Sequence, residues 1–496
     1  MPIPLMTARS RRVTLAPPHD GDGGVMQDFH TVTPTRWMHR GEALVEANYP
    51  LVVWSGIPGE TARVRVEHRG SNRAYSVWLE ADQPHEHRVD PPCERYRLCG
   101  GCPIMHLSSD GQQTMRRHLV GAALHESGLY DVTFGDWHPS PDGFEDFRHV
   151  VKLGFGRSDR GRIRVGAWGR TSRQIVPIPQ CTVAHPALRR AMNALAHHTI
   201  ELDIWPWEAE KGRGCLRAAV LRVSRHTGEV LITLIAGAHN NRLSDLAAQV
   251  AMQVSEVVGI AVHYNADEGN NIFSRDEEGA IRVRYLEGSD SFVEKLGDIE
   301  YDVGHGDFFQ TNPAVAEVLY KRVLDASELE DGVPFVDLYS GVGGIALQAA
   351  QRTGWALGVE EVDGAVLRAR EAARRQHIPA EFVSGRVDEV LPEVARRVAK
   401  ARPVVSVNPA RRGLEPGVVE HILSLRPRRI AYVSCNPRAL ARDLIAFREA
   451  GFTVAPLELF DMFPNTPHVE ILAVLEAPDS GADAEARAPR RRRVSR

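Results

Sequence analysis

The pattern of apolar and polar positions changes character along the chain. Between residues 41 and 80, short runs of alternating apolar and polar residues are separated by turn residues such as Pro58-Gly59, which is typical of short β-strands. Strand patterns recur in residues 146–180 and 217–235, and helical patterns in residues 111–128 and 241–257. The patterns predict a small β-barrel of OB-like type, followed by a central domain of the α+β class.

The C-terminal third has a different pattern, in which apolar strands alternate with amphipathic helices. An apolar run at 333–339 enters a glycine-rich turn, and a helical pattern follows at 345–353. A second strand at 356–360 and a second helix at 363–376 repeat the order, and the alternation continues to Leu475. This pattern predicts an α/β domain with a doubly wound, Rossmann-like sheet.

The two ends of the chain lack periodicity. Residues 1–36 are rich in Gly, Pro, Asp and Arg, and residues 477–496 end in a run of four arginines. Both segments are predicted to be disordered, the second as a basic tail. The resulting domain boundaries are 37–92 for the barrel, 93–305 for the central domain and 306–476 for the α/β domain.

Composition limits the class of protein. The chain has 496 residues, 43% of them hydrophobic and 25% charged, with a formal net charge of -4. This is a globular balance, so a nucleic-acid-binding surface would have to be local. No apolar run is long enough for a signal peptide or a membrane span, which predicts a cytoplasmic protein without a membrane partner. In that compartment cysteines are more often ligands or catalysts than disulfides.

Three cysteines lie within ten residues of one another. Cys93, Cys99 and Cys102 surround the pair Gly100-Gly101, and Cys181 follows far downstream. Four thiolates can complete a tetrahedral site, which suits zinc or an iron–sulfur cluster, and the spacing does not distinguish the two. The alternative is that these cysteines are buried without a ligand.

A second set of residues suits a nucleotide-like ligand. Gly341, Gly343 and Gly344 follow the first strand of the α/β domain, and Glu360 ends the next strand. A glycine-rich turn lets the backbone approach a ligand, and an acid at that place can accept hydrogen bonds from ribose hydroxyls. The glycine spacing departs from the dinucleotide fingerprint and fits S-adenosylmethionine better. A tight strand-to-helix turn without a ligand is the alternative.

Three further polar residues lie at strand ends of the α/β domain. Cys435 follows the strand 430–433, Asn408 precedes a basic loop that contains Arg411, and Glu470 begins the strand 471–475. Ligands bind at the carboxyl ends of strands in such sheets, which favours a functional role for Cys435 and Asn408. A lone cysteine is more often simply buried, and an acid at a strand start is usually solvated.

A basic stretch lies at residues 148–173. It has eight Lys or Arg residues against one acid, Asp159, with Phe155 and Trp168 among them. Positive charge beside aromatic faces is typical of an RNA-binding surface. A solvated arginine-rich hairpin is the alternative.

Taken in order, these residues resemble the bacterial RNA uracil-C5 methyltransferase family, over residues 37–475. The most specific segments are Phe308-Phe309-Gln310-Thr311-Asn312-Pro313, Ser434-Cys435-Asn436-Pro437 and residues 460–470. The resemblance is to the ribosomal-RNA members, and it implies that the barrel is a TRAM domain. It further implies a [4Fe–4S] cluster on Cys93, Cys99, Cys102 and Cys181. It also implies Cys435 as nucleophile, Glu470 as base, and an S-adenosyl-L-methionine site at Gln310, Tyr339, Gly341, Gly343, Glu360 and Asn408.

The implied function is class I methylation of C5 of a uridine by a monomer without an obligate protein partner, with 23S rRNA as the favoured RNA. Asn408 stands where other members have Asp, and Arg386 follows Gly385 where an acid is frequent, which leaves Asp388 as the candidate for adenine recognition. One alternative is a tRNA uridine-C5 methyltransferase, although such relatives are expected to resemble only the C-terminal half. The other is a catalytically silent RNA-binding or assembly protein.

Overall fold

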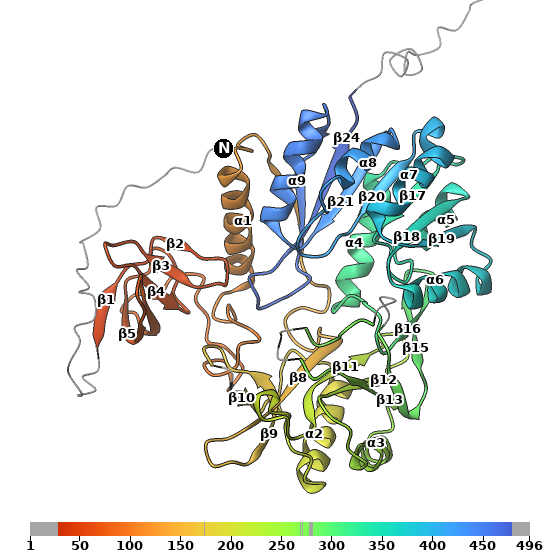
Figure 1. The fold of residues 1–496 in the computed structure, drawn as a ribbon. Helices are drawn as coiled ribbons and strands as arrows, with labels where there is room; N and C mark the ends of the chain where they lie inside the picture. Colours follow the sequence, from red (N-terminus) through yellow and green to blue (C-terminus); the bar gives the residue numbers. More distant parts are fainter. Residues whose placement is uncertain (1–27, 173, 268, 270, 277–280, 479–496) are drawn as a thin grey trace, which may run out of the picture.

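A six-stranded sheet forms the N-terminal part of the protein. The computed structural model describes residues 28–478 except 173, 268, 270 and 277–280, so most of both predicted disordered ends lies outside the described residues. The strand order is β1-β5-β6-β4-β3-β2, and the sheet lies at the left of Figure 1. The strands are β1 Phe29–Val32, β2 Arg36–Trp37, β3 Ala43–Val45, β4 Leu51–Trp54, β5 Ala62–Arg69 and β6 Ala74–Glu80.

One sequence prediction for this region is corrected. Strand β1 lies inside the predicted leader and pairs with β5, with Phe29 opposite Arg65 and Val32 opposite Ala62. The leader prediction was therefore too long, because pairing with a distant strand orders residues that have no periodicity of their own. The sheet has β1 and β2 as its two ends, and within residues 28–478 no pairing joins them. The β-barrel of OB-like type stays a prediction.

The central domain is built on a seven-stranded sheet of order β10-β9-β8-β11-β12-β13-β14. The predicted hairpin at 217–235 is confirmed, and its two strands are almost completely buried. Helices α2 and α3 pack against one face of the sheet through Leu188, Leu195, Leu246 and other apolar residues. The elements are β8 Val150–Arg157, β9 Ile163–Trp168, β10 Ile175–Val176, α2 Pro186–Glu201, the 3-10 turn Ala209–Lys211, β11 Leu216–Val223, β12 Val230–Ala236, α3 Arg242–Gln253, β13 Val257–Tyr264 and β14 Arg284–Gly288.

The C-terminal domain is the expected doubly wound α/β domain, with a nine-stranded sheet. Its order is β19-β18-β17-β20-β21-β24-β23-β7, and β22 also pairs with β24. The elements are α4 Pro313–Ala326, β17 Phe335–Leu338, α5 Ala346–Thr353, β18 Ala356–Glu360, α6 Asp363–Arg375, β19 Ala380–Ser384, α7 Val387–Val398, the 3-10 turn Ala399–Ala401, β20 Val404–Val407, α8 Val418–Ser424, β21 Arg429–Ser434, α9 Pro437–Glu449, β22 Thr453–Val454, β23 Leu457–Phe460 and β24 Glu470–Glu476.

Successive residues of the buried strands supply two separate cores, one on each face of this sheet. Phe335 of β17 packs with α4, α5 and α6, whereas the next residue, Val336, packs with α7, α8 and α9. This alternation follows from the two-residue period of a strand. Helices on both faces explain why the strands are continuous apolar runs.

The predicted boundary between the central and α/β domains is wrong for one segment. Helix α1 (Ser109–Glu126) packs against α9, and β7 (Phe134–His138) pairs in parallel with β23 at the edge of the α/β sheet. Both elements fall within the predicted central domain, 93–305, yet they complete the C-terminal domain. Only long-range pairing decides where such an edge strand docks. Figure 1 shows α1 between the N-terminal sheet and α9.

A short hairpin connects the central and α/β domains. Strands β15 (Ser291–Leu296) and β16 (Ile299–Gly304) pair with each other and contact α4 and α6. Within the part of the chain that the structure describes, no helix is both long and apolar enough to cross a membrane.

Candidate active site

Cys435 and Glu470 face each other at the carboxyl end of β21. In the antiparallel pair of β21 and β24, Ser434 lies opposite Ile471, so the next step of the ladder places Cys435 opposite Glu470. Side chains at facing positions have Cβ atoms about 4.5–5.5 Å apart and point to the same face. The structure therefore brings together the two residues that the sequence suggested for catalysis.

Burial disfavours the ionised forms of both the Cys435 thiol and the Glu470 carboxyl. Glu470 is 5% exposed, and its burial raises its pKa to about 8, with Arg411 acting in the opposite direction. Burial raises the pKa of Cys435 to about 11, and the negative charge of Glu470 adds to this effect. The charge of Arg411 and its hydrogen bond to the thiol lower the pKa of Cys435. A thiolate and a carboxylate can thus coexist here only beside this cation.

Arg411 lies beside both Cys435 and Glu470, although the sequence reasoning gave it no role. The sequence could have indicated Arg411 by its position, because it lies in the loop that follows β20 and begins with Asn408. The side chain of Asn436 donates a hydrogen bond to the carbonyl of Arg411 at 2.7 Å. The loop that carries the cation is therefore tied to the loop that carries Cys435.

Helix α1 fixes the loop that leads to Glu470. The buried guanidinium of Arg116 pairs with Asp461 at 3.0 Å and donates to the carbonyls of Phe463 and Thr466 at 3.0 and 3.1 Å. Gln112 and Asn465 exchange two hydrogen bonds of 3.1 and 2.9 Å. A buried charge held by several partners is costly to displace, so the position of Glu470 is well defined.

The glycine-rich turn after β17 has the geometry expected for a nucleotide-like ligand. Gly343 has φ +88, and a Cβ there would lie 2.9 Å from the ring of Phe382, so only glycine fits. At Gly341 a Cβ would meet nothing within 4 Å, which leaves room for a ligand. The carboxylate of Glu360 accepts hydrogen bonds from the backbone N–H groups of Gly341 and Val362, at 3.0 and 2.9 Å. These contacts hold an acid at the mouth of the turn, as a ribose would require.

The remaining predicted cofactor residues surround this turn, and their hydrogen bonds differ. Gln310 is buried and hydrogen-bonded to Tyr320, whereas the Tyr339 hydroxyl donates to Glu415. The backbone N–H of Asn408 donates to Leu338 at 3.3 Å, which joins the ends of β17 and β20. Asp388 forms an ion pair of 2.9 Å with Arg386. Arg386, which stands where an acid is frequent in the family, therefore pairs with Asp388, the residue that was expected to recognise the adenine in its place.

The four clustered cysteines line one cavity of about 1430 Å³. Burial raises the pKa of Cys102 to about 12, and the other three thiols contribute to this rise. No three of these sulfur atoms, all of them in the described part of the chain, lie within 4.8 Å of one another. Thiolates around a tetrahedral zinc ion would be about 3.8 Å apart, given Zn–S bonds of about 2.3 Å. Four thiols around one cavity have the donor chemistry that a soft metal group requires, and their spacing here is not that of a single tetrahedral zinc ion.

The same cavity reaches the active-site loops. Its lining includes Arg411, Thr466 and His468, together with Arg148 and Lys152 at the base of the basic hairpin. Arg160, Arg162 and Arg164, which stand near the tip of that hairpin, are not part of the lining. The structure thus divides the basic stretch: its base faces the cavity and its tip does not.

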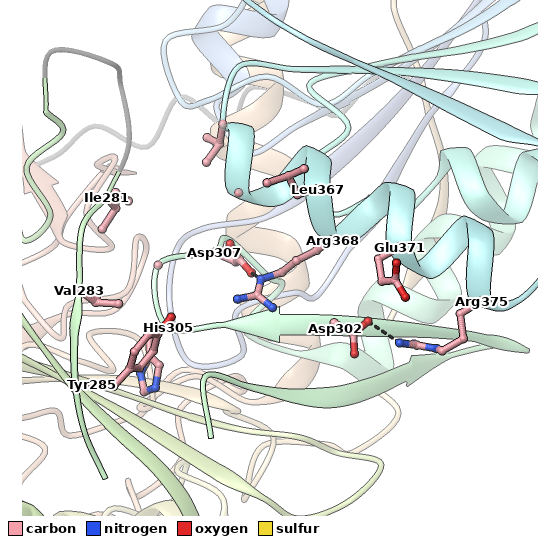
Figure 2. A pocket seen from close by; sticks show the side chains of 13 residues that line it. Ile281, Val283, Tyr285, Asp302, His305, Asp307, Leu367, Arg368, Glu371 and Arg375 are labelled. Atoms are coloured by element: carbon pink, nitrogen blue, oxygen red, sulfur yellow. Dashed lines mark hydrogen bonds and ion pairs between the residues drawn. The ribbon is translucent and has the colours of Figure 1, made fainter. Parts of the chain in front are cut away.

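A second cavity of about 560 Å³ lies between α6 and residues 281–285. Figure 2 shows Ile281, Val283 and Tyr285 on one wall and the charged residues Arg368, Glu371 and Arg375 of α6 on the other. Arg368 pairs with Asp307 at 2.8 Å and Arg375 with Asp302 at 2.6 Å. Neither Cys435 nor Glu470 is among the lining residues of either cavity. Only the first cavity is lined by residues of the active-site loops, among them Arg411 and His468, so we assign the chemistry to that end of it.

Comparisons with known proteins agree with this geometry. Residues 400–477, which contain Arg411, Cys435 and Glu470, match the family described as tRNA (Uracil-5-)-methyltransferase. An uncharacterized RNA methyltransferase of Listeria innocua is 29% identical over 435 residues, which covers 86% of this chain and 92% of the relative. A further one, from Halalkalibacterium halodurans, is 29% identical over 453 residues, 90% of this chain and 97% of the relative.

A solved structure is similar over nearly the whole fold. The tRNA (uracil-54, C5)-methyltransferase of Pyrococcus abyssi in complex with S-adenosyl-L-homocysteine has a TM-score of 0.68 and 26% identity, covering 90% of this chain and 100% of that one. The expectation that tRNA enzymes resemble only the C-terminal half is therefore wrong. Sequence and fold agree: the chain is an S-adenosylmethionine-dependent RNA methyltransferase, and it is similar to the RNA uracil-5-methyltransferase family.

Proposed function

We propose that this enzyme methylates C5 of a uridine in 23S rRNA through a covalent bond between Cys435 and C6 of the uracil. The observation that carries the proposal is the facing pair of Cys435 and Glu470 with Arg411 beside both. A nucleophile and a base on the same face can act on adjacent ring atoms, C6 and C5, of one uracil. No other part of the described chain offers this combination beside the glycine-rich turn.

Each residue has a defined role in this reaction. Uracil C5 is a poor nucleophile, and addition of the Cys435 thiolate to C6 turns C5 into an enolate carbon that can attack a methyl group. S-adenosylmethionine supplies that electrophilic methyl group when it is bound. Glu470 then takes the C5 proton, which restores the double bond as the thiolate leaves. In this proposal Gln310 donates a hydrogen bond to the uracil oxygen on which the enolate charge develops.

The cysteine site is proposed to hold a [4Fe–4S] cluster with a structural role. The loop that carries three of the proposed ligands is hydrogen-bonded to β9, because the backbone N–H of Gly100 donates to the carbonyl of Trp168 at 3.0 Å. Ile104 of the same loop donates to the carbonyl of Asn465 at 3.2 Å, in the loop before Glu470. A cluster here would stabilise the contact between the loop that carries the cysteines and the active site. The cavity of about 1430 Å³ that these cysteines line is called here the RNA cavity. Methyl transfer itself needs no electrons.

Protein purified without oxygen is expected to be brown and to contain about four irons per chain. Cys102→Ala should lower the iron content and broaden the thermal transition. Cys215→Ala is the matched control, because Cys215 is a buried cysteine that does not line the cavity of the other four. A colourless protein with one zinc ion would contradict the cluster assignment. Iron content and absorption spectra read this out independently of activity.

A tRNA uridine is the second candidate substrate. It is favoured by one observation, the similarity over 90% of this chain to the tRNA (uracil-54, C5)-methyltransferase of Pyrococcus abyssi. The N-terminal sheet and cysteine site therefore do not by themselves distinguish the two RNAs.

The substrate test compares both RNAs directly. Purified enzyme with tritiated S-adenosylmethionine is expected to label unmodified 23S rRNA transcripts at 5-methyluridine, at a rate at least about 10-fold above tRNA transcripts. Nucleoside analysis identifies the product, and primer-extension mapping locates the uridine. Preferential labelling of tRNA would move the assignment to the second candidate. A methylated nucleoside other than 5-methyluridine would overturn the proposed reaction.

A further inference from the structure

Three aromatic side chains form a continuous stack on the N-terminal sheet. Trp54, Tyr75 and His68 lie on the neighbouring strands β4, β6 and β5. The ring centroids of Trp54 and Tyr75 are 6.0 Å apart with planes inclined by 29°, and those of Tyr75 and His68 are 6.2 Å apart at 24°. Tyr75 is thus the middle ring of a nearly parallel series, called here the aromatic platform.

The register of the sheet explains why the three rings share a face. Tyr75 is opposite Val52 on β4, and Trp54 is two residues further along that strand. Residues two apart on a strand point to the same side. On the other neighbouring strand, His68 lies directly opposite Tyr75. None of the three rings belongs to the core of this sheet, which is built from residues such as Leu51, Val53 and Val64.

The platform lacks the contacts that would make it a structural feature. Tyr49, a core residue of the same sheet, uses its hydroxyl to bind the backbone, and Trp78 is covered by Arg88 at 4.0 Å. By contrast, the Trp54 indole and the Tyr75 hydroxyl form no hydrogen bond with the described residues. Partly exposed aromatic rings without polar partners are suited to stacking on a ligand.

The platform and the active-site loops open into one cavity. All three rings line the cavity of about 1430 Å³ that also contains Arg411, Thr466 and His468. In Figure 1 the N-terminal sheet lies on one side of α1 and the catalytic domain on the other. An RNA chain that lies beside Arg411 can therefore continue to the platform without leaving the cavity.

The charge of this cavity suits a nucleic-acid backbone. Its acidic lining residues are Glu42 and Glu67, and its basic ones are Arg40, Arg95, Arg148, Lys152, Arg170 and Arg411. The excess of positive charge is local, because the whole chain has a net charge of -4. Cations that follow a groove and rings that stack on bases are the two parts of a single-strand binding site.

We propose that the aromatic platform stacks on unpaired bases that flank the target uridine, so that the substrate is a single-stranded RNA segment. This deepens the proposed function and rests on it for the identity of the target base. A duplex could not use the platform, because the bases of an A-form helix do not present their faces to side chains. The platform therefore selects for a loop or an opened strand around the uridine.

Binding of a labelled RNA tests this without turnover. The probe is a fluorescein-labelled single-stranded RNA of about 15 nucleotides with a central uridine. Trp54→Ala and Tyr75→Ala should each raise Kd by about 5- to 100-fold, from the loss of one stacked base. Tyr75→Phe keeps the ring and should restore most of the affinity. In methylation assays KM should rise, while kcat at saturating RNA changes little.

The matched control is Phe29→Ala. Phe29 is 37% exposed on β1 of the same sheet and lies outside the cavity, under Arg63. The Phe29→Ala variant should bind RNA with the affinity of the wild type. Thermal unfolding and S-adenosylhomocysteine binding verify that each variant is folded.

A second arm identifies what the rings contact. Removing single flanking bases from the probe, with the backbone intact, should weaken binding to the wild type. The same removals should have little further effect on the Trp54→Ala, Tyr75→Ala double variant, since bases and rings act as pairs. Annealing a complementary strand over the flank should abolish the difference between wild type and variants.

Two outcomes would overturn the proposal: platform variants that bind like Phe29→Ala, or a base-removal penalty that is the same in the double variant. Either result leaves the proposed reaction standing if the wild type makes 5-methyluridine. Conversely, if the product is another nucleoside but the platform variants bind weakly, the proposed reaction fails and the platform remains. The two failures are therefore distinguishable.

Discussion

Cys435→Ala is expected to reduce methyl transfer by at least about four orders of magnitude, because without the C6 adduct C5 has no enolate with which to attack. S-adenosylhomocysteine should bind with unchanged affinity. The cofactor turn is held by contacts of Glu360 with Gly341 and Val362, none of which involves Cys435. Radioactive methyl transfer and calorimetric titration measure the two quantities.

The control for this experiment is Cys215→Ala, because Cys215 is a buried cysteine of the central core that lies outside the RNA cavity. It should keep full activity. A Cys435→Ala enzyme that still transfers methyl groups would disprove covalent catalysis. Loss of both activity and cofactor binding would instead indicate that the residue supports the cofactor site.

Glu470→Gln is expected to fail in a different way, by trapping the methylated RNA on the protein. The variant keeps the nucleophile and the shape of the site, but an amide cannot take the C5 proton. Attack and methyl transfer can proceed while expulsion of the thiolate stalls, so turnover should fall by about 10²- to 10⁴-fold. A denaturing gel should show a shifted protein band that contains RNA and the labelled methyl group.

Two checks accompany this experiment. The shifted band should be missing in the Cys435→Ala, Glu470→Gln double variant, since no bond to C6 can form. Normal turnover of Glu470→Gln would mean that another residue or a water molecule is the base. Ser424→Ala, an exposed position at the end of α8, controls for the handling of the variants.

The raised pKa of Glu470 gives the trapping experiment a pH dependence. In the free enzyme this pKa is about 8, so at neutral pH most of the carboxyl is protonated and cannot act as a base. Release of tritium from C5 of the RNA should therefore increase as pH rises through 8. It should go on increasing above that pH, because the Cys435 thiol, with a pKa of about 11, must also ionise. Arg411→Gln removes the cation that lowers both pKa values and should move this rise to higher pH.

Local patterns in the sequence determined the elements and the type of domain. The strand, glycine turn and helix around Gly341 and Gly343 were predicted at their observed places, because helix and strand periods and tight turns depend on neighbouring residues. Cys435 and Glu470 were noticed at strand ends for the same reason, whereas the roles suggested for them came from the resemblance to a known family. The four cysteines were also identified from their spacing, and the structure places them around one cavity.

Contacts between distant segments decided how the elements are grouped into domains and which loops meet at the active site. β1 became ordered through β5, and α1 and β7 joined the α/β domain because its helix α9 and its edge strand β23 offered them partners. Arg411 became part of the active site only when its loop met that of Cys435.

The same contacts divided the basic hairpin into a base that faces the RNA cavity and a tip that does not. They also aligned Trp54, Tyr75 and His68, which the sequence does not mark as a group. The sequence by itself therefore determined most of the elements and the type of the C-terminal domain, and it suggested which residues carry the chemistry. Only the tertiary structure decided which of them share a surface, because sheet register and domain packing depend on pairing energies between residues far apart in the chain.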